Sequence, residues 1–126
     1  MASTMEVGQR LVELCKVNRN VDAVNTLYAQ DVLSIEAAGH PGMPQRQQGI
    51  DAIRGKNQWW IDNHTVNSTT IAGPFPHGER FIILYKTDVT PKAGPKAGQR
   101  MQVEEAGLYT VRDGKVVQEE FFYNMG

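Results

Sequence analysis

Apolar residues recur every three or four positions in three stretches within the first half of the chain. The stretches cover residues 6 to 17, 21 to 29 and 50 to 63, and this spacing is typical of helices with one buried face. Their apolar positions are Val7, Leu11, Leu14, Cys15, Val21, Val24, Leu27, Tyr28, Ile50, Ile53, Trp60 and Ile61. The pattern therefore predicts three helices, each of which covers a core with one side.

Much of the remaining chain alternates between apolar and polar residues, which is the pattern of a half-buried strand. Such runs occupy residues 32 to 36, 65 to 72 and 81 to 89, and two more flank Asp113-Gly114 between residues 101 and 124. An Asp-Gly pair between alternating runs is a strong hairpin signal. Helices early and strands late predict an α+β fold, with the helices covering the concave face of a curved mixed or antiparallel sheet. Such a sheet encloses a conical cavity suited to a small molecule.

Length, charge and cysteine content narrow the class of protein. The chain has 126 residues, which is the size of one domain spanning residues 1–126. Its 13 basic and 14 acidic residues nearly balance, so we expect no binding of nucleic acid or of an anionic membrane. The sequence shows no signal-peptide pattern, and its lone Cys15 suits a reducing compartment. We therefore expect a cytoplasmic domain.

Carboxylates and tyrosines are the main candidates for chemistry. The predicted hairpin carries four glutamates, two on each arm, so a sheet built around it must place some of them on a covered face. His40 lies in a loop expected over the cavity mouth, where it could contact a ligand. The sequence contains no His/Cys cluster with metal-ligand spacing, no phosphate loop and no dinucleotide fingerprint. We therefore expect neither a metal nor a cofactor.

Three segments of the chain resemble the nuclear transport factor 2-like superfamily, which includes ketosteroid isomerases and SnoaL-like polyketide cyclases. They read NVDAVNTLYAQDVLSIEAAG (residues 20–39), QGIDAIRGKNQWW (48–60) and LYTVRDGKVVQEEFFYN (108–124). In that order they resemble the family's second helix with its first strand, the Gly-x-x-Ala-Ile-Arg opening of its third helix, and its Asp-Gly-Lys hairpin with an aromatic-rich last strand. The resemblance implies a single SnoaL-like domain with a cone-shaped, cystatin-like roll.

The resemblance also implies where a catalytic carboxylate would lie. Glu36 falls on the position of the carboxylate that removes a proton next to a ketone in isomerase-like members. The isomerases' oxyanion donors, a tyrosine and an acid, are replaced here by Leu11 and approximately Gly107. SnoaL-like cyclases keep an aspartate base on the last strand, where this chain has Phe121. Glu36 is therefore the candidate base, while the usual partners are missing.

The register of the terminal hairpin decides which of its side chains face the cavity. A two-residue loop pairs Arg112 with Lys115 and turns Glu120 inward, whereas a three-residue loop with a bulge at Gly114 turns Glu119 inward. We favour the three-residue loop because the family's pocket positions fall on that face. The predicted inward set is then Glu36, Trp60, Ile83, Tyr85, Glu105, Tyr109, Glu119, Phe121 and Tyr123. The predicted outward set is Leu108, Val116 and Phe122, a patch suited to a second copy in a homodimer.

Two functions of different classes fit these expectations. The first is a cofactor-independent isomerase or cyclase acting on a hydrophobic carbonyl compound. In this reading Glu36 is the base, and Tyr85, Tyr109 or Glu105 stabilises the enolate. The other inward residues would contact the ligand. The alternative is a non-catalytic ligand-binding or assembly module with the same cavity, and the burial of Glu36 is the first observation that discriminates between them.

Overall fold

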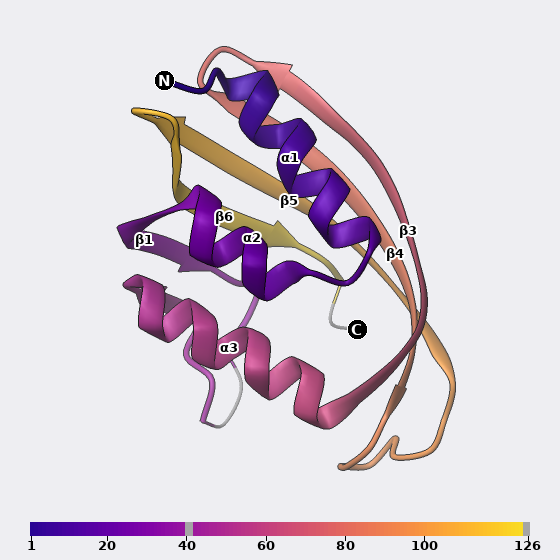
Figure 1. Ribbon diagram of the computed structural model, residues 1–126. Coiled ribbons are helices and arrows are strands. Elements are labelled where there is room, and N and C mark those ends of the chain that lie inside the picture. The colour runs from indigo at the N-terminus through magenta and orange to yellow at the C-terminus, as the bar shows by residue number, and fades with distance from the viewer. Residues whose placement is uncertain (40–41, 125–126) are drawn as a thin grey trace.

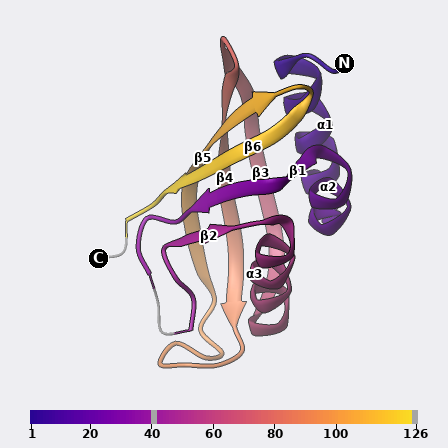
Figure 2. The same cartoon turned by 90° about the vertical axis from the view of Figure 1, so that its left-hand side faces the viewer.

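Three helices and six strands make up the described part of the chain, residues 1–39 and 42–124 of a computed structural model. The helices are α1 (Thr4–Lys16), α2 (Asn20–Leu27) and α3 (Ile50–Asn63). The strands are β1 (Tyr28–Ile35), β2 (Arg46–Gln48), β3 (His64–His77), β4 (Arg80–Pro91), β5 (Met101–Arg112) and β6 (Lys115–Phe122). Figures 1 and 2 show the helices together on one side of a strongly curved sheet. The predicted α+β fold is confirmed.

The strands form a single mixed sheet in the order β2-β1-β6-β5-β4-β3. Strand β1 runs parallel to β6, and every other pairing is antiparallel. The parallel pair joins the first strand of the chain to the last and places Ser34 directly beside Glu119. Residues from both ends of the sequence therefore meet in the middle of the sheet.

Helix α1 packs against the sheet with the predicted apolar stripe. Val7, Leu11 and Leu14 are each at most 4% exposed, and Cys15 is 7% exposed. Burying an apolar side chain of this size stabilises a fold by roughly 1.5–3 kcal/mol. A capping box between Ser3 and Glu6 satisfies backbone donors at the start of the helix. The predicted first helix is confirmed, and it begins two residues earlier because of this cap.

Other element boundaries differ from the sequence prediction. The second helix ends at Leu27, and β1 begins at Tyr28 rather than at residue 32. Tyr28 is buried, but in a strand instead of on a helix, because pairing with β6 overrides the local helical spacing. The three-residue strand β2 was not predicted, since its sequence Arg46-Gln47-Gln48 carries no apolar alternation.

The terminal hairpin has the two-residue turn that we did not favour. Arg112 pairs with Lys115, and both Asp113 (φ 52°) and Gly114 (φ 75°) are left-handed, as a tight hairpin turn requires. The expectation of a three-residue loop was wrong. Val116 is fully buried opposite Val111, so its predicted place on the outward patch was also wrong.

A bulge in β6 nevertheless produces the inward face that we predicted for Glu119. The pairing passes from Val111–Val116 to Thr110–Gln118, which leaves Val117 without an opposite residue. An extra residue in one strand reverses the faces of all residues beyond it. Tyr109 is therefore paired with Glu119, and both are buried. The bulge lets the strand bury Val116 and Glu119 on the same side.

Candidate functional site

A lysine that the sequence analysis missed lies at the centre of the candidate site. Lys56 stands one helical turn after Ile53 on the buried face of α3, and its side chain is only 10% exposed. Its Nζ donates to Ser34 Oγ at 2.5 Å and to Glu119 Oε2 at 3.0 Å, and it lies 3.0 Å from Glu36 Oε1. A charged residue at i+3 on an otherwise apolar stripe was the only signal for it in the sequence.

Glu119 is the most deeply buried carboxylate of the site. Its side chain is 3% exposed, and both of its oxygens have partners within the protein. Tyr28 donates to Oε1, while Ser34 donates to Oε2 at 2.7 Å. The prediction that Glu119 faces inward is confirmed. Because all of its contacts are internal, this carboxylate holds the network together and does not face the pocket.

The ionisation of the lysine follows from these neighbours. Burial by itself lowers the pKa of Lys56, but the carboxylates of Glu119 and Glu36 outweigh this effect and raise the pKa above its ordinary value. Lys56 is therefore a charged ammonium shared by two carboxylates. It also lies 4.7 Å above the centre of the Phe121 ring, whose face attracts a cation.

Glu36 lies at the edge of this network, just after β1. Its side chain is 18% exposed, with Oε1 facing Lys56 and Oε2 accepting a hydrogen bond from Tyr123 at 3.3 Å. Burial and the nearby Glu36 charge raise the pKa of Tyr123 to about 12, so this phenol keeps its proton. Glu36 is thus held on both oxygens beside the solvent-accessible space, and it is not a freely exposed strand-end residue.

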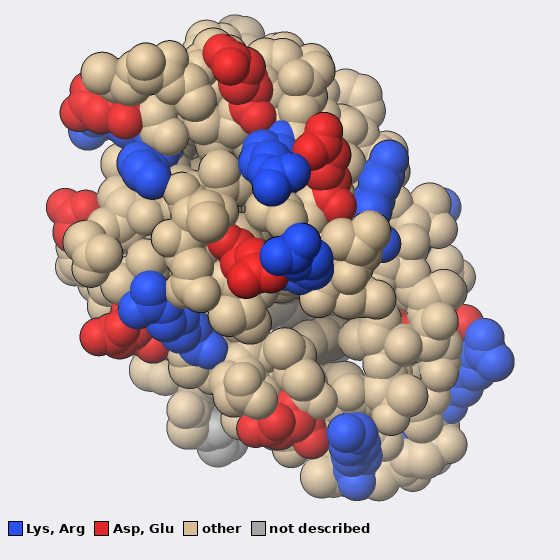
Figure 3. All heavy atoms as spheres, in the orientation of Figure 1, with Lys and Arg blue, Asp and Glu red and all other residues tan. Residues whose placement is uncertain are grey.

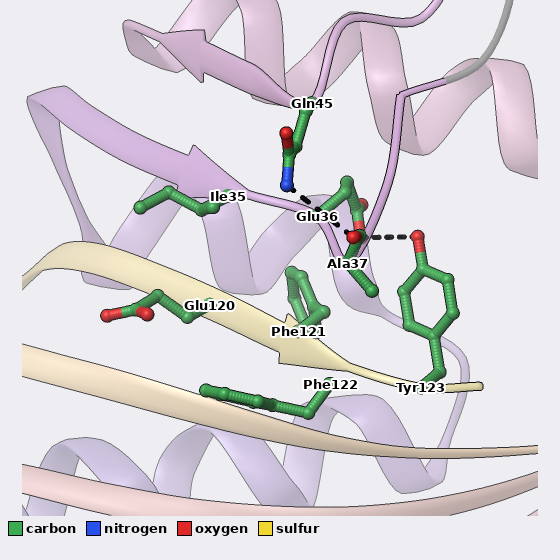
Figure 4. Close-up of a pocket in the computed structure, with 8 residues that line it drawn as sticks. All are labelled: Ile35, Glu36, Ala37, Gln45, Glu120, Phe121, Phe122 and Tyr123. Carbon is green, nitrogen blue, oxygen red and sulfur yellow. Dashed lines mark hydrogen bonds between the residues drawn. The ribbon is translucent and has the colours of Figure 1, made fainter. Parts of the chain in front are cut away.

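A pocket of about 360 Å³ opens at the point where β1 and β6 end. Figure 4 shows Tyr123 directed toward Glu36, whereas Glu120 points away from it. The lining residues are Ile35, Glu36, Ala37, Gln45, Glu120, Phe121, Phe122 and Tyr123. Glu36 and two aromatic residues of the predicted inward set therefore share one pocket.

Figure 3 shows that acidic and basic side chains are interspersed on one face of the molecule.

Glu105 is the third carboxylate of the interior. It pairs with Tyr85 across β4 and β5 and shares the inward face. Burial, helped by repulsion from Glu36 and opposed by Lys56, raises the pKa of Glu105 to about 7. At neutral pH this group therefore exists in both forms, and it can both donate and accept a proton.

Two predicted enolate donors, Tyr85 and Tyr109, instead bond to each other. Their hydroxyl oxygens are 2.5 Å apart, and Tyr109 is 2% exposed with its ring stacked on Phe81. The Tyr109 ring also fills the space next to Gly107, where an added Cβ would lie 2.8 Å from the ring. The Tyr109 ring therefore leaves no room for a side chain at position 107. The inward orientation is confirmed, but neither hydroxyl lies in the pocket lining.

The remaining predicted ligand contacts divide into two groups. Phe121 and Tyr123 line the pocket, as expected. Trp60 is only partly buried and stacks on His64 with ring centres 3.8 Å apart, so the structure places it at the end of α3 and not in the pocket lining. His40 lies outside the described residues.

Neither a metal-binding cluster nor a membrane-spanning helix occurs within residues 1–39 and 42–124. Within these ranges, no group of three or more His, Cys, Asp or Glu side chains could hold a metal ion. No helix in the described part of the chain is long and apolar enough to cross a membrane.

Known proteins share both this fold and this sequence pattern. The SnoaL-like domain family matches residues 2–123, so the chain belongs to that family. A crystal structure from Mesorhizobium loti, described as a candidate SnoaL-like polyketide cyclase, is 38% identical with a TM-score of 0.88. The alignment covers 97% of this chain and 100% of that one. No significant match occurs among curated proteins.

More distant structures share the fold alone. A protein from Catenulispora acidiphila with a ketosteroid isomerase-like fold, solved with trimethylamine, is 19% identical with a TM-score of 0.73 over 95% of this chain and 86% of that one. A Xanthomonas campestris protein described with a cystatin-like fold is 11% identical, with a TM-score of 0.77 over 97% and 91% of the two chains. The cystatin-like description agrees with the fold class predicted from the sequence.

Proposed function

We propose that this protein catalyses cofactor-independent proton transfer, of the isomerase or cyclase type, on a hydrophobic carbonyl compound. The observation that carries this proposal is the position of Glu36. Its carboxylate lines the pocket, and Lys56 and Tyr123 hold it on opposite oxygens. Abstraction of a proton next to a carbonyl requires a base that is held in a fixed orientation and partly shielded from water.

The proposed reaction assigns a separate role to each polar group. Glu36 removes a proton from the carbon beside the carbonyl, and the electrons of the broken C–H bond move to the carbonyl oxygen to form an enolate. The proposed proton donor to that oxygen is Glu105, which lies behind the pocket lining, where its charge interacts with that of Glu36, and whose pKa of about 7 keeps a protonated fraction at neutral pH. Isomerisation follows when Glu36 returns its proton to another carbon and the enol oxygen returns its proton to Glu105. Cyclisation follows when the enol carbon attacks a second carbonyl, whose oxygen takes the proton held by Glu36 while the enol oxygen returns its proton to Glu105.

The pocket walls support a hydrophobic substrate. Phe121, Phe122 and Ile35 line the space beside Glu36. The relative from Mesorhizobium loti supports the cyclase form of the reaction, because it is described as a candidate polyketide cyclase and resembles this chain along its whole length. Tyr85 and Tyr109 remain proposed as supporting residues behind the pocket lining, and His40 remains a proposed ligand contact.

Ligand binding without catalysis is the second candidate function. The observation that favours it is the completeness of the internal network: among the described residues, no buried side-chain nitrogen or oxygen lacks a hydrogen-bond partner. A lysine ion pair also weakens a carboxylate as a base, since it stabilises the charged form. A binding module would use the same pocket and leave Glu36 permanently paired.

Substitution of Glu36 distinguishes the two functions. Glu36→Gln keeps the shape of the side chain and removes the base, so exchange of the α protons of a panel of cyclic ketones in D₂O should fall by roughly 10²-fold or more. Exchange is followed by NMR. The control is Glu104→Gln, which changes an exposed carboxylate on β5. Equal exchange rates in Glu36→Gln and the unaltered protein would favour the binding module.

We also propose that the protein acts in the cytoplasm as a homodimer. The cytoplasmic assignment is supported by Cys15, which is unpaired and buried. Burial raises the pKa of this thiol to about 12, so it is unreactive and suits a reducing compartment without serving as a nucleophile.

A further inference from the structure

Lys56 has no hydrogen-bond donor left for a ligand. An ammonium group carries three N–H donors, and the three acceptors around this one are Ser34, Glu119 and Glu36. Its side chain is 10% exposed, and Lys56 does not belong to the pocket lining. Lys56 therefore acts on any ligand through Glu36 and not by direct contact.

The network also fixes where the ammonium lies. Glu119 and Ser34 hold Nζ from the sheet side, and Tyr28 in turn holds Glu119. These anchors come from β1 and β6, the parallel pair at the centre of the sheet. Glu36 is the only one of the three acceptors that reaches the pocket. The positive charge of Lys56 therefore acts on a bound ligand through Glu36.

We propose that Lys56 is a positioning residue for Glu36, fixing its carboxylate at the pocket wall. This inference rests on the proposed role of Glu36 as the base. Without Lys56, three carboxylates would share a partly buried space with no counter-ion, and such clusters take up protons to reduce their charge. Glu105, whose pKa is already about 7, would take up a proton, and Glu36 would lose the cation that fixes its carboxylate at the pocket wall.

Several elements bring ionisable groups to this cluster. Helix α3 contributes Lys56 alone among the groups described here, and α1 brings Cys15. The sheet and its ends contribute Tyr28, Glu36, Tyr85, Glu105, Tyr109, Glu119 and Tyr123. The tyrosine and cysteine pKa values are all raised by burial, so these groups stay neutral near pH 7. Only the three carboxylates can respond to removal of the lysine.

The test is a proton count on Lys56→Met, made without any substrate. We expect the carboxyl groups of the variant to release about one proton fewer than those of the unaltered protein between acid and pH 7, because one carboxyl stays protonated once the buried positive charge is gone. Potentiometric difference titration gives the number, and carboxyl-carbon NMR shows which side chain changes. Lys56→Arg restores the charge and should restore the count. The matched control Lys86→Met, in an exposed pair with Glu104, should change nothing.

Catalysis provides a second and separate readout. In Lys56→Met, α-proton exchange should fall tenfold or more at pH 7, and Lys56→Arg, which restores a cation beside Glu36, should recover most of the rate. An unchanged proton count in a folded Lys56→Met protein would overturn the positioning role. A changed count in a protein with no exchange activity would support it and reject only the proposed function.

A second variant keeps the proposal testable if Lys56→Met does not fold. Glu119→Gln retains side-chain shape and leaves Lys56 with Glu36 as its only paired carboxylate. The pKa of Glu105, now about 7, should then fall, because Glu119 raises it and Lys56 lowers it. NMR titration of the Glu105 carboxyl measures this shift, and an unchanged midpoint would overturn the proposal.

Discussion

At the scale of single residues, Glu105 links the proposed chemistry to stability. Its pKa rises from 4.5 to about 7 on folding, mainly through burial. A carboxyl whose pKa is raised in the folded state favours folding only while it is protonated in that state. The associated stability is fully present below pH 4.5 and is lost as the pH rises through about 7. The group therefore makes the folded protein less stable in mildly alkaline solution than in mildly acidic solution.

Glu105→Gln should remove this pH dependence. The amide keeps the shape of the protonated acid, so the variant should match the unaltered protein near pH 4.5 and exceed it at pH 8 by up to about 3 kcal/mol in free energy of unfolding. Denaturant unfolding at the two pH values measures the difference. A constant difference between the two proteins at all pH values would contradict the assignment.

At the scale of elements, the sequence predicted the helices and strands that have a regular apolar pattern. It did not predict features that depend on contacts between residues far apart in the chain. The stripe on α1 and the alternation on β4 were readable because each element buries one regular face. Lys56 broke the stripe of α3, and only its contact with Glu119, 63 residues away, explains its burial. The turn at Asp113-Gly114 was recognised, but its length and the bulge at Val117 depend on pairing with β5 and β1. The candidate base Glu36 was found from resemblance, while its cation was not.

The bulge in β6 gives a prediction at this scale. Deleting Val117 should leave Tyr109 opposite Glu119, because the residues that remain then pair one to one along the strand. The protein should fold with a loss of no more than about 2 kcal/mol. Cross-strand NOEs between Tyr109 and Glu119 check the register. Inserting an alanine after Gln118 instead should turn Glu119 outward and lose the network. A folded deletion variant without these NOEs would contradict the register argument.

At the scale of the whole molecule, the outer face of the sheet carries exposed apolar side chains opposite the helices. Ile82 pairs with Leu108, and Leu84 pairs with Ala106, which in turn pairs with Phe122. Exposed fractions are 38% for Ile82, 44% for Leu84 and 53% for Phe122. The residues adjoin across three strands, so they form one continuous patch. The predicted outward positions of Leu108 and Phe122 agree with this face, although Val116 does not belong to it.

A symmetric dimer would bury this patch against its own copy, and charge on the patch should prevent that association. We therefore expect the unaltered protein to sediment as a dimer at micromolar concentration and Leu84→Lys to sediment as a monomer. Ile61→Lys is the matched control, since Ile61 is 46% exposed on α3 and far from the outer face of the sheet. Because Leu84 and Ile61 are similarly exposed, the two substitutions should have similar effects on the stability of one subunit. Only Leu84→Lys should lower the sedimenting mass. Monomeric unaltered protein, or a dimer that survives Leu84→Lys, would show that this face is not the interface.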